Sequence, residues 1–289
     1  NMYQREPIGI NVVRPLSEGI VKNGEMLNQL VKYYVEKNVK KRPFSNLRCV
    51  FCLPNPDISD SDVKSLIRSL ATANVTRMHK IERAFAAAVG MDADVVENKA
   101  KMIVDIGSFS SDIAIVADNA VYSERISKVG GEAFTSAIQE LVLAYESKEV
   151  KIGWHVAEDI KRKSSVNFME SPDTLVKIVG KNSLLGRVEK LEIPQRLINE
   201  KLYERLKPLL VEMRDMFQGL EDRFKSDIAD HGIMLSGGGA ALDGLATAVA
   251  ESFNVQVRVF QNSSKYCAAR GCAIIADDPE RYGLFGRRA

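Results

Sequence analysis

The chain has 289 residues, of which 45% are hydrophobic and 27% charged, so it is long enough for one large domain or two lobes of an ordinary soluble protein. Its 40 Lys and Arg residues nearly balance 38 Asp and Glu residues, and no nucleic-acid-binding motif is present, so nucleic acid is not an expected partner. No apolar run approaches the roughly 18–20 residues that span a bilayer. The first ten residues have no signal-peptide core, and we therefore expect a cytosolic protein.

In chain order, the first predicted element is a buried strand over 46–54, an apolar run that ends at proline. The next residues, DISDSDVKSLIRSLATAN, predict a helix, because Asp and Ser offer an N-cap and apolar residues recur at helical spacing. VTRMHKI predicts a short strand. ERAFAAAVGM predicts a helix of small residues that ends near Gly90, and 102–117 predicts two strands, continued by AVYSERISKVG.

The second half continues the alternation. Helices are predicted at 132–145 and at about 154–163, and a small β-rich insertion at about 164–193. A long amphipathic helix begins at Pro194, and we expect Pro208 to kink or break it. GIMLSGGGAALDGLATAVAESF predicts a strand, a triple-glycine turn and a helix, VQVRVF a strand, and SSKYCAARGCAIIAD a serine-capped final helix. This order is typical of an α/β fold with mainly buried sheets.

The four cysteines lie in two pairs, Cys49 with Cys52 and Cys267 with Cys272. A zinc site would need both pairs folded together with suitable coordination geometry. Small buried thiols in a reducing compartment explain the same residues more simply, and we favour that interpretation.

Two turns have residues suited to a phosphate ligand. In DIGSFSSD, residues 105–112, the aspartate at the strand end can hold hydrated magnesium, and the glycine lets backbone N–H groups approach phosphate oxygens. A plain hairpin with a polar turn explains this segment equally well. In SGGGA, residues 236–240, three glycines remove every Cβ from one surface, which favours a flat ligand or a phosphate over a tight packing corner.

A third segment, AEDIKRK, places Glu158 and Lys161 three residues apart on one helix face. Taken alone, this spacing predicts a solvated surface pair.

Together and in this order, these segments resemble the MreB-type bacterial actins of the actin, heat-shock-chaperone and sugar-kinase ATPase superfamily. The similarity extends from about residue 5 to residue 276. INVVRPLSEGIV resembles the family's N-terminal segment, MIVDIGSFSSDIAIV its second phosphate loop and VGGEAF the turn after that loop. AEDIK resembles the helix that flanks the adenine, and HGIMLSGGGAALDGLATAVAESFNVQV resembles the adenosine motif most specifically.

The resemblance implies an actin-like two-lobed α/β fold around a cleft for ATP or ADP with Mg²⁺. It places Asp105 near the magnesium ion, Gly107, Ser108 and Ser110 at the phosphates, and Glu158 and Lys161 beside the purine and ribose. The full set of implied cofactor-binding residues is Asp105, Gly107, Ser108, Ser110, Gly131, Glu158, Lys161, Gly237, Gly238 and Gly239.

Three departures from the family pattern predict weak or absent ATP hydrolysis. The first phosphate hairpin has no counterpart. Arg83 occupies the position of the family's glutamate that polarises the attacking water, and Glu82 lies one place away, so no catalytic residue is assigned. Loss of a positioned base lowers the rate of a reaction by about a hundred- to ten-thousand-fold. Arg83 cannot accept a proton, although it can pair with a phosphate. Phe109 replaces a glycine, which would cost about 1–2 kcal/mol if φ is positive there, and its bulk would crowd the γ-phosphate.

By this resemblance, residues 1–101 form a first lobe that is incomplete without the hairpin and is joined again by the C-terminal helix at 263–277. Residues 102–262 form a second lobe, with 164–193 as its small subdomain. Without the hairpin, the strand at 46–54 would have an open edge, which sheets normally avoid. We expect either that further residues precede Asn1 in the native chain or that another segment covers this edge.

The leading functional hypothesis is a cytoskeletal subunit involved in cell shape, which stacks head to tail into an open filament. A non-polymerising pseudo-ATPase that acts as an adaptor or regulator of a true actin-like filament is the alternative. A small-molecule kinase is disfavoured because no substrate-side aspartate can be assigned and fold alone does not fix activity.

A basic loop suggests where such a protein would meet the inner face of the membrane. Lys40, Lys41 and Arg42 precede Phe44, and each cation near an anionic lipid surface contributes about 1 kcal/mol. An ordinary charged loop before a strand explains the same residues.

Overall fold

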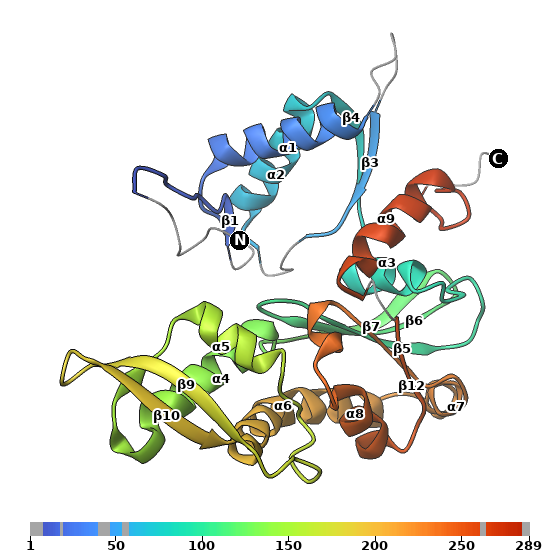
Figure 1. The fold of residues 1–289 in the computed structure, drawn as a ribbon. Helices are drawn as coiled ribbons and strands as arrows, with labels where there is room; N and C mark the ends of the chain where they lie inside the picture. Colours follow the sequence, from blue (N-terminus) through green and yellow to red (C-terminus); the bar gives the residue numbers. More distant parts are fainter. Residues whose placement is uncertain (1–7, 18–19, 40–46, 54–57, 261–263, 285–289) are drawn as a thin grey trace.

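A computed structural model shows the architecture of the chain (Figure 1), and it describes residues 8–17, 20–39, 47–53, 58–260 and 264–284. The N-terminal elements pack together on one side of a larger body. They are β1 (Leu16–Ser17), β2 (Ile20–Val21), α1 (Gly24–Asn38), β3 (Leu47–Phe51), α2 (Asp60–Thr72) and β4 (Val75–Lys80). Helix α1 packs on α2, and β3 pairs with β4 in parallel. The predicted N-cap of α2 is confirmed, because the Asp62 N–H donates to the Ser59 hydroxyl at 3.2 Å.

The larger body is built on a five-stranded sheet with the order β12-β11-β5-β6-β7. The strands are β5 (Lys101–Ile106), β6 (Ser111–Ala117), β7 (Ala120–Ser127), β11 (Ile233–Ser236) and β12 (Val257–Val259). Strands β5, β6 and β7 run antiparallel, whereas β11 runs parallel to both β5 and β12. Every residue of β5 and β6 is buried, because helices cover both faces of the sheet.

Two helices, α3 (Arg83–Gly90) and α9 (Cys267–Asp277), cover one face of this sheet, and their buried side chains join Ile103, Ala114 and Met234 in one core. The other face packs against a second core with helices from the rest of the body. These helices are α4 (Gly131–Ala144), α5 (Trp154–Lys161), α6 (Gln195–Gln218), α7 (Asp222–His231) and α8 (Leu245–Phe253). A smaller sheet consists of β8 (Val150–Lys151), β9 (Leu175–Asn182) and β10 (Val188–Pro194), so the predicted β-rich insertion is confirmed.

The structure corrects two details of the predicted helices. Helix α6 continues through Pro208 to Gln218, so the proline does not break it; Leu206, Leu209 and Leu210 on either side are buried and hold the turn in place. The final helix is not capped by a serine. It begins at Cys267 after a 3₁₀ turn, Ser264–Tyr266, and no side chain in the described region caps it.

Helices α3 and α9 cross with their backbones in close contact. A Cβ added at Gly271 would lie 1.7 Å from the Ala86 carbonyl oxygen, and one at Gly90 would lie 1.9 Å from the Cys267 carbonyl oxygen. Each helix therefore needs a bare backbone where the other passes. Since α9 also contacts β3, this crossing joins the N-terminal strands to the five-stranded sheet.

We expect Gly271→Ala to lower the free energy of unfolding by about 1–3 kcal/mol, because the added methyl group collides with main chain rather than with a side chain that can turn away. Urea denaturation measures this change. Gly24→Ala at the start of α1, where nothing lies within 4 Å of the added Cβ, is the matched control. Equal stabilities of the two variants would contradict the close crossing.

Cysteines from the two ends of the chain meet beside this crossing. The Sγ atoms of Cys52 and Cys272 lie 3.4 Å apart, and Cys267 is buried in α9. The hydrogen bond with Cys272 and burial raise the pKa of the Cys52 thiol. Among the described residues, no group of three or more His, Cys, Asp and Glu side chains is arranged to hold a metal ion.

The pairing of β3 bears on the prediction that the strand at 46–54 has an open edge. Within the described ranges, β3 pairs with β4 and with no other strand. Helix α9 packs against β3, so part of this strand is covered by a helix rather than by a strand.

Candidate functional site

The turn at 107–110 is held by hydrogen bonds of its own main chain and of α4. The Gly107 N–H donates to the Ser110 carbonyl at 2.9 Å. The first N–H groups of α4, from Gly131 and Glu132, donate to the carbonyls of Gly107 and Ser108 at 2.9 and 2.8 Å. A Cβ at Gly130 would lie 2.6 Å from the Ser108 carbonyl oxygen, so only glycine permits this approach. The turn and the VGGEAF segment thus form one rigid corner.

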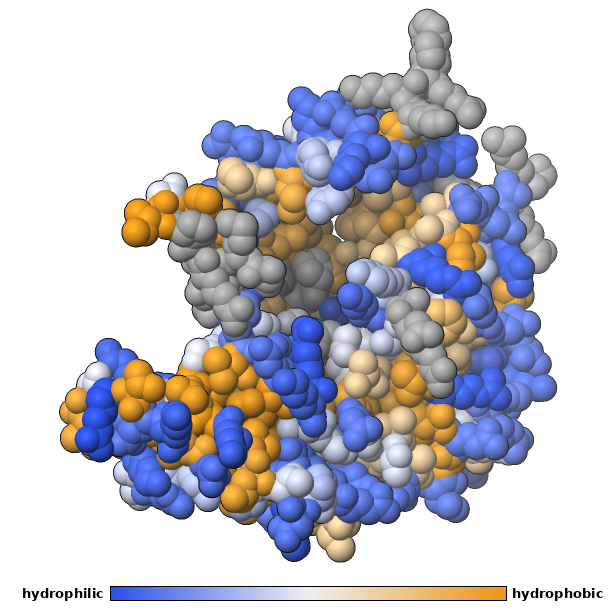
Figure 2. All heavy atoms as spheres, in the orientation of Figure 1, coloured by the Kyte–Doolittle hydropathy of each residue, from blue (hydrophilic) through white to orange (hydrophobic). Residues whose placement is uncertain are grey.

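A cleft of about 730 Å³ opens beside this corner, and Figure 2 shows the molecule hollowed between the N-terminal elements and the larger body. Gly107 and Ser108 line one part of the cleft, and the 3₁₀ turn Gly238–Ala241 lines another. Helices α4 and α5 contribute Gly131, Glu132, Phe134, Trp154, Glu158, Lys161 and Arg162. Arg14 and Leu16 of the N-terminal segment, Leu242, and Lys265 before α9 also line the cleft.

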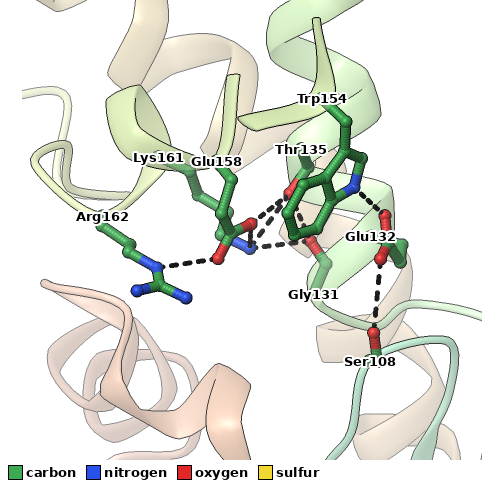
Figure 3. A network of polar contacts seen from close by, with 8 residues as sticks. All are labelled: Ser108, Gly131, Glu132, Thr135, Trp154, Glu158, Lys161 and Arg162. Atoms are coloured by element: carbon green, nitrogen blue, oxygen red, sulfur yellow. Dashed lines mark hydrogen bonds and ion pairs between the residues drawn. The ribbon is translucent and has the colours of Figure 1, made fainter. Parts of the chain in front are cut away.

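Glu158 of α5 lies at the centre of a polar network in the cleft (Figure 3). Its carboxylate forms an ion pair with Lys161 Nζ at 2.5 Å and accepts hydrogen bonds from Thr135 Oγ1 at 2.8 Å and Arg162 Nε at 2.9 Å. Lys161 Nζ also donates to the Gly131 carbonyl at 3.1 Å. Glu158 is only 8% exposed, so the expected solvated surface pair is instead a buried link between α4 and α5.

The charge state of Glu158 follows from these contacts. Burial acts to raise its pKa, but the hydrogen bonds from Lys161, Thr135 and Arg162 outweigh burial and hold the pKa below its usual value. Glu158 therefore stays ionised, and it fixes Lys161 and Arg162 along one wall of the cleft.

A second network orients Trp154, the only tryptophan in the sequence. Its indole Nε1–H donates to the Glu132 carboxylate, whose other oxygen lies 3.5 Å from the Ser108 hydroxyl (Figure 3). Trp154 begins α5 and lines the cleft, so an aromatic ring stands next to the 107–110 turn.

The three glycines of the 236–240 turn have different surroundings. Gly237 has φ +82°, and a Cβ there would lie 2.2 Å from the Ile106 carbonyl oxygen. A Cβ at Gly239 would lie 2.2 Å from the Ile106 side chain. Only Gly238 has room, since the nearest atom to its added Cβ is Lys265 Cβ at 3.9 Å. Packing against β5 thus accounts for Gly237 and Gly239, while Gly238 and Gly239 line the cleft.

Asp105 and Asp112 face one another as register partners on β5 and β6, and Arg83 from α3 lies between them. Arg83 Nε lies 3.2 Å from Asp105 Oδ2 and also forms an ion pair with Asp112 Oδ2. Asp105 Oδ1 accepts a hydrogen bond from the Ser236 hydroxyl. Burial raises the pKa of both aspartates, although the charge of Arg83 acts to lower it.

Phe109 does not have the strained conformation considered from the sequence. It is absent from the non-glycine residues with positive φ, and its side chain is 40% exposed. Phe109 is not among the residues that line the cleft, and crowding of the γ-phosphate by its ring stays a prediction.

The structure thus brings together most of the residues that the sequence singled out. Those in the cleft are Gly107, Ser108, Gly131, Glu158, Lys161, Gly238 and Gly239. Asp105, Ser110 and Gly237 lie outside the described lining, and Ser110 instead accepts a hydrogen bond from Arg83 Nη2 at 3.3 Å. Arg14, Glu132, Trp154 and Lys265 were not predicted from the sequence, although Glu132 follows Gly131 at the start of α4 and Trp154 follows Gly153, the N-cap of α5.

A model of the MreB/Mbl protein family matches residues 1–283. The chain belongs to the MreB/Mbl family. It is 27% identical over 282 residues to the cell shape-determining protein Mbl of Bacillus subtilis (strain 168), an alignment that covers 97% of this chain and 83% of that relative.

Solved structures of this group share the fold. MreB 5 of Spiroplasma citri bound to AMPPNP matches with a TM-score of 0.84 at 20% identity, over 96% of this chain and 82% of that one. A MamK double helical filament matches with a TM-score of 0.70 at 17% identity, over 92% of this chain and 78% of that one. The expected actin-like α/β fold is confirmed.

The cleft of this MreB/Mbl member suits an adenine nucleotide. Arg14, Lys161, Arg162 and Lys265 outnumber Glu132 and Glu158 among its charged lining residues, as a polyanionic ligand requires. The uncrowded main chain at Gly238 can lie against a flat base.

The surroundings of Asp105, in contrast, do not fit a magnesium ion. This aspartate is 5% exposed, and both of its oxygens already have partners, Arg83 and Ser236. A hydrated ion held by oxygen ligands needs a carboxylate that reaches the ligand space. The residues described here offer none at the position that the resemblance assigned to the metal.

Proposed function

We propose that this chain is an actin-like cytoskeletal subunit that assembles head to tail into filaments involved in cell shape, with ADP or ATP bound in the cleft. The main support is that separate motif segments of this MreB/Mbl chain line one cleft, in which cationic side chains outnumber carboxylates. In this arrangement Lys161 and Arg162 border the sugar, Lys265 lies beside the Gly238 turn, and Trp154 stands beside the phosphate turn.

The outer face of the β9–β10 hairpin supports self-association. Figure 2 shows hydrophobic side chains gathered over this hairpin, and the exposed residues there are Leu175, Val179, Leu184, Leu185 and Val188. Exposed apolar clusters of this kind are typical of protein contacts. In a head-to-tail filament, we place the hairpin against the next subunit.

Weak or absent hydrolysis is part of the proposal. Arg83, at the position of the expected glutamate, is held by two carboxylates, and Glu82 lies in a separate small cavity with Asp112 and Glu124. The acidic residues in the described lining are Glu132 and Glu158, which accept hydrogen bonds from Trp154 and Lys161 respectively. Both carboxylates in this lining are thus engaged by other side chains, which supports weak or absent hydrolysis.

The presence of Arg83 in place of the expected glutamate also favours the second candidate, a non-polymerising adaptor or regulator of another actin-like filament. Electron microscopy of the full chain with and without ATP separates the two functions. Ordered double filaments support the first. A persistent monomer that joins filaments of a related protein supports the second.

Location follows from the same proposal. No helix in the described part of the chain is long and apolar enough to cross a membrane. We propose a cytoplasmic subunit that meets the inner membrane face through Lys40, Lys41, Arg42 and Phe44, which lie outside the described residues. Sedimentation with anionic and neutral vesicles tests this contact, since charge attraction predicts binding to the anionic vesicles alone.

Nucleotide binding can be followed with the intrinsic fluorescence of Trp154. We expect ADP to change its emission, and Gly238→Val to weaken ADP binding at least about tenfold, or roughly 1.4 kcal/mol, because the new side chain enters the cleft. Thermal unfolding should be nearly unchanged, since nothing crowds the added Cβ. Equal ADP affinities of Gly238→Val and the native chain would place the nucleotide elsewhere.

A further inference from the structure

Arg83 lies where its positive charge is shared by two acidic residues and by the phosphate turn. Its side chain is 16% exposed, against 8% for Asp105 and 1% for Asp112. Besides the two ion pairs, Nη2 donates to the Ser110 hydroxyl at 3.3 Å. A Cβ added at Gly107 would lie 3.4 Å from Arg83 Nη1, so the guanidinium packs directly behind the turn.

The two aspartates need a cation between them. They are opposed across β5 and β6, and like charges in that relation repel one another. Asp112 Oδ1 is buried and has no hydrogen-bond partner among the described residues. A divalent ion could balance such a pair in a protein that lacked Arg83. Here the guanidinium of the chain itself supplies the balancing charge.

The same contacts separate the aspartates from the ligand space. Gly107 and Ser108 line the cleft, whereas Asp105, Asp112 and Arg83 lie outside its described lining. A metal ion bound to nucleotide phosphates beside the turn would therefore not meet the carboxylate of Asp105 or Asp112. Lys265, a cationic side chain at the cleft, can instead balance phosphate charge.

We infer that Arg83 replaces the divalent cation, so that this protein binds adenine nucleotides without a requirement for Mg²⁺. The inference rests on the proposed nucleotide cleft. The inference goes beyond that cleft, because it predicts a nucleotide site without the hydrated ion that would otherwise link phosphate to an aspartate.

Calorimetric titration of the full chain with ADP, in EDTA and in excess MgCl₂, tests the inference. We expect dissociation constants that agree within about threefold, or roughly 0.7 kcal/mol. Binding at least about tenfold weaker in EDTA would overturn the inference and leave the nucleotide cleft standing. Absence of binding under both conditions would overturn the nucleotide cleft and this inference with it.

A charge-matched variant tests the role of Arg83 itself. Arg83→Gln combined with Asp112→Asn removes one positive and one negative charge and leaves Asp105 free of its cation. We expect ADP binding by this variant to become at least about tenfold tighter with Mg²⁺ than in EDTA. Arg205→Gln at the exposed Arg205–Glu140 pair is the control. Equal ADP affinities of the double variant with Mg²⁺ and in EDTA would contradict the role of Arg83. If this variant does not fold, the titration of the native chain tests the inference by itself.

Discussion

Arg83→Met is expected to lower the free energy of unfolding by about 3–5 kcal/mol, because it leaves two buried carboxylates without their shared cation. The methionine fills a similar volume, so most of the loss is electrostatic. Urea denaturation of the two proteins at neutral pH measures it. A change within about 0.5 kcal/mol, the range of ordinary surface substitutions, would contradict the ion-pair geometry.

The pH dependence of this loss identifies its cause. Burial raises the pKa of Asp105 and Asp112, and removing Arg83 raises both further. A carboxyl group whose pKa is higher in the folded than in the unfolded chain stabilises the fold at low pH and loses that contribution as the pH rises. The deficit of Arg83→Met is therefore largest at neutral pH and shrinks as the pH falls toward the ordinary aspartate value of 3.8.

Two further variants serve as controls. Arg205→Met removes a cation from an exposed pair with Glu140 and should cost less than about 1 kcal/mol. Asp112→Asn should cost clearly less than Arg83→Met, because it leaves one guanidinium with one carboxylate. If Asp112→Asn were the more harmful change, the aspartates would not be competing for the same cation.

Replacing both leucines at the β9–β10 turn with aspartate is expected to abolish filament assembly. Leu184 and Leu185 are 77% and 60% exposed, so the change should leave the fold intact while placing two charges in the proposed contact between subunits. We expect the critical concentration to rise at least about a hundredfold, which corresponds to roughly 2.8 kcal/mol for each subunit contact. Sedimentation and electron microscopy measure the assembled fraction.

The matched control is Val211→Asp on α6, an isolated exposed apolar residue at 49% exposure. It should assemble like the native chain. Normal filaments from the Leu184→Asp, Leu185→Asp double variant would exclude the hairpin turn from the contact, and loss of assembly by both variants would indicate a general effect of added charge.

Local signals predicted much of the fold. The Asp and Ser residues before α2, the small residues of α3 and the apolar runs of β5 and β6 each specify an element by short-range chemistry, and the structure has all of them. Helices α1 and α7 were not predicted, although each has apolar residues at helical spacing, Leu27, Leu30 and Val31 in α1 and Phe224 and Ile228 in α7.

The site was harder to predict because its details are tertiary. Sequence spacing places Glu158 and Lys161 on one helix face, but only the packing of α5 against α4 buries them with Thr135. Gly237 and Gly239 are glycines because Ile106 passes so near, a contact between segments about 130 residues apart. The engagement of Asp105 by Arg83 likewise depends on where α3 meets the sheet.

The position of Arg83 also has an evolutionary consequence. If an ancestor had the glutamate that the family pattern suggests here, a simple reversal in this chain would bring a third acidic group to Asp105 and Asp112, with no cation among them. Such a variant would lose about 3–5 kcal/mol of stability unless another cation balanced the three carboxylates. Recovery of a hydrolytic site would then be helped by a second change on β6 that removes one of these charges.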